Sequence, residues 1–275
     1  MNMKNSILLL DPEFDPNMAP DCNLLLKITN DSFSYAIINQ DSKSLKAVFD
    51  EQACSNMTQT LKTKIKNDPY LNYPYKEVKI AVSTDNCVTV PNELFNSKDL
   101  NAYINFFTKA PSKTLHVKNN PDFDFTSIFC LQQHLEDELD VHFKAASKHE
   151  QSESVLNLAA HVDNGLVFDF TALSFTAIQV ENSKLIFKNT FEIESGDEFN
   201  YFLLLLIKQL DIDFEQTPVY ISGIINDNDQ NFRTLKKYFK NIQFSLPQNK
   251  EIDCRILEDM PAYYYSSLLA IDLCV

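Results

Sequence analysis

The sequence predicts an α/β protein of two consecutive units, each with three antiparallel strands followed by alternating helices and strands. Two observations predict this fold class. Residues 22–49 and 164–191 repeat the same order of apolar strands and polar turns. An amphipathic helical segment then follows each repeat, at residues 51–66 and 197–210. Strands that feed helices returning to the sheet require mixed sheets with helices on both faces.

The two repeats agree in register. Each begins with an apolar strand, at residues 24–28 or 166–170. A Ser-Phe pair opens the second strand of each repeat, Ser32-Phe33 in the first and Ser174-Phe175 in the second. A polar turn and a third strand follow in both. Agreement in order, length and turn position predicts an internal duplication.

The second unit continues in a simple order. We expect a strand at 218–221, a helix at 230–239, a strand at 242–246 and a last helix from Pro261 to Leu273. The run Tyr263, Tyr264 and Tyr265 at the start of that helix is a candidate partner-binding patch. The favoured alternative is that most of this run packs into the core of the second unit.

The last strands and helices of the second unit have counterparts in the first unit, but these occur further along the chain. This spacing predicts an insertion near residues 72–120. The insertion is expected to contain a hairpin (78–82 with 88–90), a helix (100–107) and a strand (115–117). The unit would then resume with a strand at 125–131, a helix at 132–139, a strand at 141–146 and a helix at 150–161. The predicted domains are therefore residues 1–163, with an N-terminal arm and the insertion, and residues 164–275.

Composition restricts the classes of partner. The chain has 275 residues and a formal net charge of −14, and an acidic surface repels phosphate backbones and anionic lipid. We therefore expect no nucleic-acid partner. No apolar stretch approaches the ~18 residues of a membrane span. The six cysteines are scattered without a C-x-x-C pair, which is typical of reduced thiols in the cytoplasm.

The strand and helix order is that of the ribonuclease H-like unit, and two such units in tandem resemble the actin, heat-shock chaperone and sugar-kinase group. The inserted segment resembles the extra subdomain of the cell-division and pilus-assembly actin-like proteins. The chain as a whole more closely resembles a family of uncharacterised Bacteroidetes proteins. The shared features are an opening arm like residues 11–16, the early Ser-Phe strand, Val90-Pro91 and Ser222-Gly223. This resemblance implies an actin-like ATPase fold and assigns no activity.

The resemblance also shows where ATP would bind. Actin-like ATPases hold the phosphates in two turns, one after the first strand of each unit, with glycine where the backbone approaches phosphate. The corresponding segments here, 29–32 and 169–174, contain no glycine. Asp169 keeps the place of a metal- or water-binding aspartate, and Ser222-Gly223 keeps one glycine of the adenosine turn. Asp169, Ser222 and Gly223 are thus the candidate cofactor-binding residues if the cleft binds nucleotide. The favoured alternative for Asp169 is an aspartate that takes turn hydrogen bonds.

Two other constellations are weaker. Asp169, Asp227, Asp229 and Asp272 would be the carboxylates of a two-metal nuclease, but the net charge of −14 argues against a nucleic-acid substrate. His134, Glu138 and His142 have the spacing of metal ligands on one helix face. The repeat instead places His142 on a strand, and Glu136, Asp137, Glu138 and Asp140 are interpreted as a solvated acidic end. We therefore expect no metal site and no catalytic residues.

These observations predict a non-catalytic actin-like scaffold or adaptor, a pseudo-ATPase without a cofactor, that acts by binding a protein partner. The candidate surfaces are the insertion, the opening arm and the interdomain cleft. The alternative is a degenerate ATPase or kinase-like enzyme that still binds a nucleotide or metabolite in that cleft.

Overall fold

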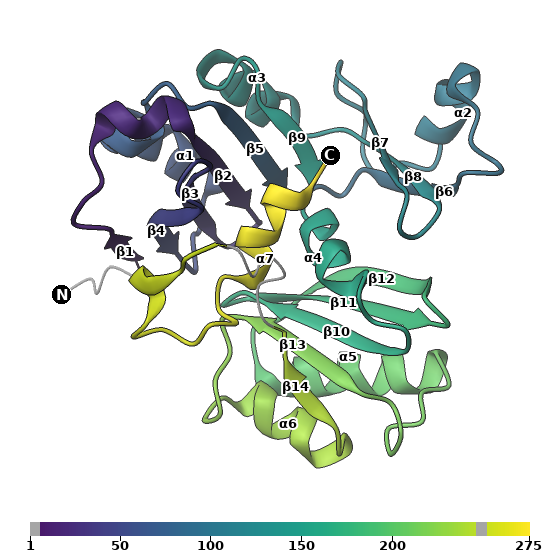
Figure 1. Ribbon diagram of the computed structural model, residues 1–275. Helices are drawn as coiled ribbons and strands as arrows, with labels where there is room; N and C mark the ends of the chain where they lie inside the picture. The colour runs from purple at the N-terminus through teal and green to yellow at the C-terminus, as the bar shows by residue number, and fades with distance from the viewer. Residues whose placement is uncertain (1–5, 246–251) are drawn as a thin grey trace.

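The computed structural model describes residues 6–245 and 252–275. Its main body consists of two mixed sheets, one above the other in Figure 1, and a smaller three-stranded sheet lies to one side. In the part of the chain described, we find no helix whose length and apolar character would let it span a membrane.

The first sheet has six strands in the order β1-β4-β3-β2-β5-β9. Strands β2, β3 and β4 are antiparallel, whereas β5 and β9 extend the sheet in parallel with β2. The strands are β1 (Ser6–Leu10), β2 (Cys22–Ile28), β3 (Phe33–Asn39), β4 (Ser44–Glu51), β5 (Glu77–Val82) and β9 (Ser147–Glu150).

The second sheet repeats this order with five strands, β12-β11-β10-β13-β14. Three antiparallel strands are again followed by two that continue in parallel with the first. The strands are β10 (Gly165–Phe170), β11 (Ser174–Glu181), β12 (Lys184–Glu192), β13 (Val219–Gly223) and β14 (Ile242–Phe244). Both sheets therefore have the strand order of the ribonuclease H-like unit, and the predicted fold class is confirmed.

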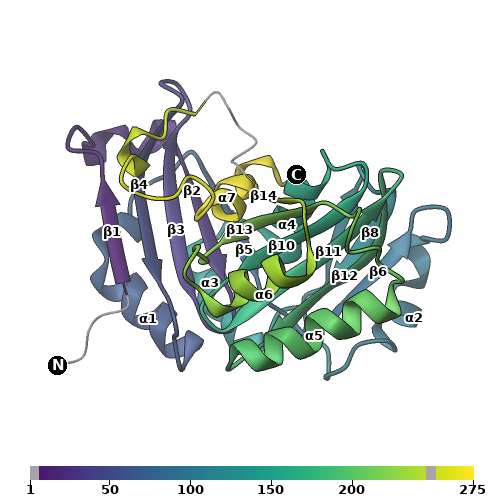
Figure 2. The ribbon, with the colours of Figure 1, turned by 90° about the horizontal axis from the view of Figure 1, so that it is seen from below.

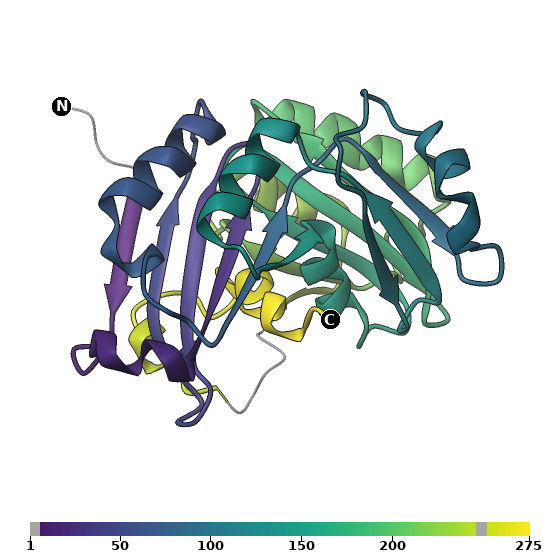
Figure 3. The same ribbon diagram turned by 90° about the horizontal axis from the view of Figure 1, so that it is seen from above.

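Helices cover both faces of each sheet because the central strands β2 and β10 carry buried apolar side chains toward both sides. On the outer face of the first sheet, α1 and α3 bury Leu61 and Leu139 against β2, and both helices lie over that face in Figure 3. On the outer face of the second sheet, α5 and α6 bury Phe199 and Leu235. Both helices lie over that face in Figure 2. The helices are α1 (Met57–Asn67), α3 (Gln133–His142), α5 (Gly196–Gln209) and α6 (Gln230–Tyr238).

Between the sheets, each unit contributes one helix to the other unit's sheet. Helix α4 (Ser152–Ala159), which ends the first unit, packs on β10 and β11 through Val155 and Leu156. Helix α7 (Ser266–Leu269) packs on β2 and β3, and Leu268 and Leu269 join the apolar cluster of the first sheet. Tyr265 lies in that same cluster and Tyr264 packs against it, whereas Tyr263 packs against the cluster of the second sheet. The expectation that most of the tyrosine run packs into the second unit's core is therefore wrong. The last helical segment also begins later than predicted, at Ser266.

The strand pairing of the inserted sheet differs from the prediction for the first unit. It has the order β6-β8-β7 and is made of β6 (Cys87–Pro91), β7 (His116–Asn120) and β8 (Phe125–Phe129), with α2 (Leu100–Ile104) beside it. The predicted hairpin of 78–82 with 88–90 is wrong, because β5 pairs in parallel with β2 while β6 pairs with β8. Likewise, β8 belongs to the inserted sheet and does not resume the first unit.

The region after the inserted sheet also differs from the prediction. The predicted strand at 141–146 is wrong, because α3 continues to His142 and the strand β9 begins at Ser147. The predicted solvated acidic end is wrong for Glu136, which is 1% exposed. Burial acts to raise the pKa of Glu136, but hydrogen bonds from the His116 ring, 3.1 Å away, and from the Lys148 ammonium outweigh it and the pKa is lowered.

Candidate functional site

Two turns with the same internal hydrogen bonds meet where the two sheets approach each other. In the turn of residues 29–32, the Thr29 N–H donates to the Ser32 carbonyl over 2.9 Å, and the two hydroxyls are 2.7 Å apart. In the turn of residues 171–174, the Thr171 N–H donates to the Ser174 carbonyl over 3.0 Å, and the hydroxyls are 2.6 Å apart. A threonine and a serine hydroxyl thus close each turn without glycine.

The two turns are hydrogen-bonded directly to each other through Asp31. Its Oδ2 accepts the Leu173 N–H over 2.7 Å and the Thr171 hydroxyl over 2.7 Å. Asp31 is 6% exposed, so these bonds are largely protected from water. A carboxylate that accepts backbone N–H and hydroxyl donors in a turn makes contacts of the kind an anionic phosphate oxygen would make. We call these two bonds the inter-turn bridge.

Two further contacts connect the same edges. The Ala172 N–H donates to the Gln52 side chain over 3.0 Å. The Asn30 amide donates to Glu192 over 2.6 Å at the exposed rim. A phosphate could enter between the turns only if these contacts and the inter-turn bridge were broken.

Beneath the turns, a buried ion pair joins the two sheets. The Lys27 ammonium on β2 lies 2.6 Å from the Asp169 carboxylate on β10, and the two side chains are 9% and 2% exposed. Lys27 also donates to the Ser267 hydroxyl on α7 over 2.6 Å. Ser222 donates to the other oxygen of Asp169 over 2.7 Å. These bonds satisfy both charged groups, as buried charges require.

The bonded residues occupy corresponding positions in the two units. Ile28 pairs with Phe33 in the first hairpin and Phe170 pairs with Phe175 in the second, so Lys27 corresponds to Asp169 and Asp31 to Leu173. Each corresponding pair is also a bonded pair, and both are separated by 142 residues. The first unit therefore carries an ammonium at the place where the second carries a carboxylate.

The structure brings the three candidate cofactor-binding residues together. Asp169 and Ser222 are hydrogen-bonded, and Gly223 follows Ser222 at the end of β13. Gly223 has a φ of +87°, and a Cβ there would lie 2.1 Å from the Phe170 carbonyl oxygen. Glycine is thus required for the close packing of β13 on β10. Asp169 takes its hydrogen bonds from Lys27 and Ser222, so the interpretation of this residue as a turn aspartate is wrong.

The other predicted constellations are not gathered into a site within the described ranges 6–245 and 252–275. His142 lies on α3, contrary to the prediction, but His134 contacts Thr58 over 2.8 Å and Glu138 pairs with Lys62 over 2.9 Å. Of the four proposed nuclease carboxylates, Asp169 pairs with Lys27 and Asp272 accepts from the Asn23 side chain.

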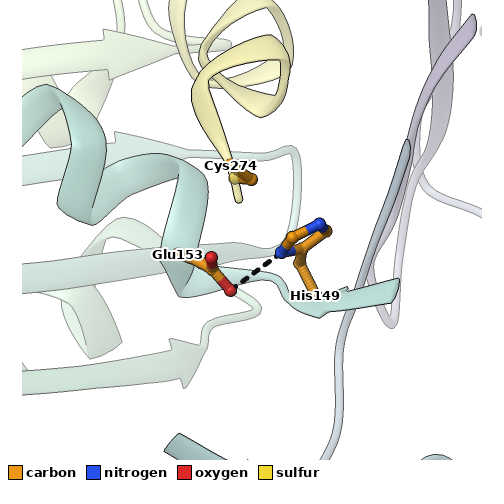
Figure 4. A group of neighbouring side chains, drawn as sticks. All are labelled: His149, Glu153 and Cys274. Carbon is orange, nitrogen blue, oxygen red and sulfur yellow. Dashed lines mark ion pairs between the residues drawn. The ribbon is translucent and has the colours of Figure 1, made fainter. Parts of the chain in front are cut away.

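One buried cluster that the sequence did not indicate has the composition of a metal site. His149 on β9, Glu153 on α4 and Cys274 near the C-terminus hold their donor atoms within 4.8 Å of one another (Figure 4). His149 Nδ1 is 3.0 Å from the Glu153 carboxylate, an ion-pair distance, but the ring is not oriented for a hydrogen bond.

Two properties of this cluster argue against a cation. Burial raises the pKa of the Cys274 thiol, which disfavours the thiolate that a metal requires. The Lys79 ammonium bonds the Cys274 carbonyl oxygen over 2.7 Å and adds a positive charge beside the cluster. A closed structural zinc site also needs four ligands. We therefore assign no metal to it.

A cavity of about 940 Å³ lies beside the turns, between the inserted sheet and β12. Asn30 and Glu192, which are hydrogen-bonded to each other, line it, as does the ion pair of Lys188 with Glu150 at 3.0 Å. Burial lowers the pKa of Lys188, but the neighbouring Glu150 carboxylate outweighs this and the pKa is raised. The cavity wall thus carries a charged lysine with a fixed partner.

Comparisons with known proteins identify the family and the fold. A family model described as protein of unknown function (DUF3822) matches residues 11–242, so the chain belongs to that family. No curated protein matches the chain. Membership of a family of unknown function confirms the predicted resemblance to an uncharacterised family.

Solved structures agree with this fold. A Bacteroides thetaiotaomicron protein with an actin-like ATPase fold and unknown function has a TM-score of 0.76 and 19% identity, covering 95% of this chain and 99% of that one. The PilM-PilN type IV pilus biogenesis complex gives a TM-score of 0.57 and 12% identity, covering 91% and 97%. The ethanolamine utilization protein EutJ from Carboxydothermus hydrogenoformans gives 0.52 and 7%, covering 97% and 93%.

Proposed function

We propose that this member of the DUF3822 family is a non-catalytic actin-like adaptor, which binds a protein partner and does not turn over a nucleotide. The observation that carries the proposal is the inter-turn bridge. In an actin-like ATPase the two turns hold phosphate between them, whereas here the Asp31 carboxylate accepts the donors of the second turn. An anion at that place repels a phosphate and already occupies its hydrogen-bond donors.

The ion pair beneath the turns supports the same conclusion. An actin-like ATPase uses a carboxylate at this level to hold a metal ion or a water molecule. Asp169 is instead neutralised by Lys27 at 2.6 Å and bonded by Ser222 at 2.7 Å. A divalent cation would have to displace a buried ammonium, which costs several kcal/mol by desolvation alone.

Binding of a protein partner is supported by the accessible cavity beside β12. The cavity beside β12 is accessible while the space between the turns is filled. PilM, which has a similar fold, was solved in a complex with PilN, so a fold of this kind is compatible with partner binding. We further infer that the two units arose by internal duplication and divide near residue 163, because corresponding residues are separated by the same 142 positions. The cytoplasmic localisation is proposed on composition alone.

The alternative function, a degenerate enzyme that retains a nucleotide, is favoured by one arrangement. Asp169, Ser222 and Gly223 are adjacent, as the resemblance to the ATPases implies for metal- and adenosine-binding residues. The two functions differ in what Mg-ATP does to the folded protein, because a ligand that binds only the folded state raises its stability.

The test is a thermal-shift titration of the full chain with Mg-ATP and Mg-ADP, together with a phosphate-release assay. We expect no concentration-dependent rise in Tm and no turnover above the buffer blank. The matched variant is Asp169→Asn, which removes the charge that a metal would need. A saturable rise in Tm or metal-dependent turnover in the natural sequence, lost in Asp169→Asn, would establish the degenerate enzyme instead.

A further inference from the structure

Strand β12 presents a free edge along the cavity. It is the end strand of the five-stranded sheet and runs for 9 residues, or about 30 Å. Within the ranges that the structure describes, β11 is its only strand partner. An unpaired edge of this length is a template for another strand, and proteins usually shorten, cover or charge such edges. This edge carries the charged residues Lys184, Lys188 and Glu192 and a bulge at Ile186, and it faces a cavity, with Ile186 49% exposed.

The hydrogen-bond register identifies the backbone groups at the free edge. The Ile193 N–H donates to the Leu173 carbonyl over 2.8 Å, and bonded pairs alternate along an antiparallel ladder. Phe191 and Asn189 therefore direct their backbone groups toward β11. Lys188 and Thr190 direct theirs away from the sheet, to the edge that a further strand would use.

The cavity runs along this edge. Its wall includes every residue from 185 to 190, although consecutive side chains of a strand point to opposite faces. A cavity that contacts both faces of one strand must pass its edge. The opposite wall includes Cys87, Thr89 and Pro91 of β6, which is itself an end strand of the inserted sheet. A peptide in this cavity would thus lie between the edge of β12 and one face of β6.

The charge of the cavity wall indicates the charge of the peptide that would bind there. Two lysines of the wall already have carboxylate partners, Lys188 with Glu150 and Lys109 with Asp85. The remaining carboxylates are those of Asp124 and Glu192, which line the cavity and, among the described residues, accept only from asparagine amides. The wall is therefore acidic overall, and a peptide with lysine or arginine complements it.

We propose that an extended, basic segment of a protein partner binds in this cavity and adds to the free edge of β12 as a further strand. The inference rests on the proposed function, because it specifies the class of partner that the adaptor would bind. Main-chain bonds to Lys188 and Thr190 supply affinity that depends little on sequence, and the side-chain positions between them supply specificity.

The experiment begins with a displayed library of random 12-residue peptides, selected on the immobilised full chain. Enriched peptides are then synthesised, and their Kd is measured by fluorescence anisotropy. Ile186→Arg and Thr89→Arg place a bulky cation on the two walls of the cavity at exposed positions. Val117→Arg, on the exposed part of β7 outside the cavity, is the matched control.

We expect enriched peptides to carry lysine or arginine and to lose at least about tenfold in affinity with the two cavity variants, with little change for Val117→Arg. N-methylation of the peptide backbone should weaken binding at every second residue only, which is the signature of a strand bonded along one edge. On binding, amide hydrogen exchange at Lys188 and Thr190 should slow, whereas Asn189 and Phe191 are protected beforehand.

The inference is overturned if no peptide is enriched, if Ile186→Arg and Thr89→Arg bind the peptides as the natural chain does, or if N-methylation has no alternating effect. These results leave the nucleotide test untouched. Conversely, turnover of Mg-ATP by a chain that still binds the peptides would contradict the non-catalytic function and not the binding edge.

Discussion

The turns of residues 29–32 and 171–174 have the same internal bonds, but the two units differ at one position within the turns and at one position beneath them. The first unit carries Lys27 and Asp31 where the second carries Asp169 and Leu173. Each difference makes a complementary bond across the two units, an ion pair of 2.6 Å and a hydrogen bond of 2.7 Å. Two similar turns that would both face a ligand have thus become partners of each other.

The ion pair should show the largest effect. Lys27→Met leaves the Asp169 carboxylate buried without a cation and should lower the free energy of unfolding by about 3–5 kcal/mol. The double variant Lys27→Met/Asp169→Leu should recover most of this loss, since an apolar pair of similar volume replaces the two charges. Urea unfolding of the three chains measures both quantities.

The control for this prediction is the exposed pair of Lys240 with Glu215, where Lys240→Met should cost less than about 1 kcal/mol. An equal cost for Lys27→Met and Lys240→Met would mean that the interdomain pair is no more important than a surface contact.

The inter-turn bridge should show a smaller effect. Asp31→Ala removes the two bonds of the inter-turn bridge and a longer one from the Ser174 hydroxyl, and it leaves the Leu173 N–H without its acceptor, at a cost of about 2 kcal/mol. Asn30→Ala, the neighbouring residue with an exposed bond to Glu192, should cost about 0.5 kcal/mol. The same denaturation measurement separates the two variants, and equal costs would contradict the central place of Asp31.

Much of this comparison could be predicted from the sequence, and part could not. The order of the second unit was predicted as far as β14, because its strands and helices follow one another with a turn signal between each pair; residue 246, the predicted end of that strand, lies outside the described residues. Its last helix begins at Ser266, not at Pro261, and packs on the first sheet. In the first unit, 77–82 and 125–129 are both short apolar runs, and sequence cannot say which of them pairs with β2. That pairing is decided by contacts between distant residues.

The candidate site was likewise predicted only in part from the sequence. The missing glycines were visible in the sequence, whereas the bonds that replace their function join residues 142 positions apart. One signal was available: the alignment of Ser32-Phe33 with Ser174-Phe175 sets Lys27 opposite Asp169. The burial of Glu136 on α3 could not be foreseen, because its partners Lys148 and His116 lie on the strands β9 and β7.

Asp50 should make the stability of the first sheet depend on pH, in contrast to the corresponding position of the second sheet. It lies on β4 opposite Ser34, and the corresponding position of the second sheet, Thr190 opposite Thr176, is uncharged. Burial raises the pKa of Asp50 to about 6, although the Gln52 amide and Lys27 act in the other direction. A raised acid pKa contributes stability that is complete below the unfolded value near 4 and is lost as the pH rises through about 6.

Asp50→Asn should therefore raise the free energy of unfolding at pH 7 by about 2 kcal/mol and have little effect at pH 4. Urea unfolding of the natural chain and the variant at pH 4, 5, 6 and 7 checks the difference. A difference that stays constant over this range would show that Asp50 carries no such penalty.

The most direct test of the central claim is the hydrogen exchange of the Leu173 amide, measured by nuclear magnetic resonance with and without millimolar Mg-ATP. Because this amide donates to a nearly buried carboxylate, we predict strong protection that Mg-ATP leaves unchanged and Asp31→Ala abolishes. Rapid exchange of Leu173 in the natural chain, or a saturable change in its exchange on addition of Mg-ATP, would contradict the account.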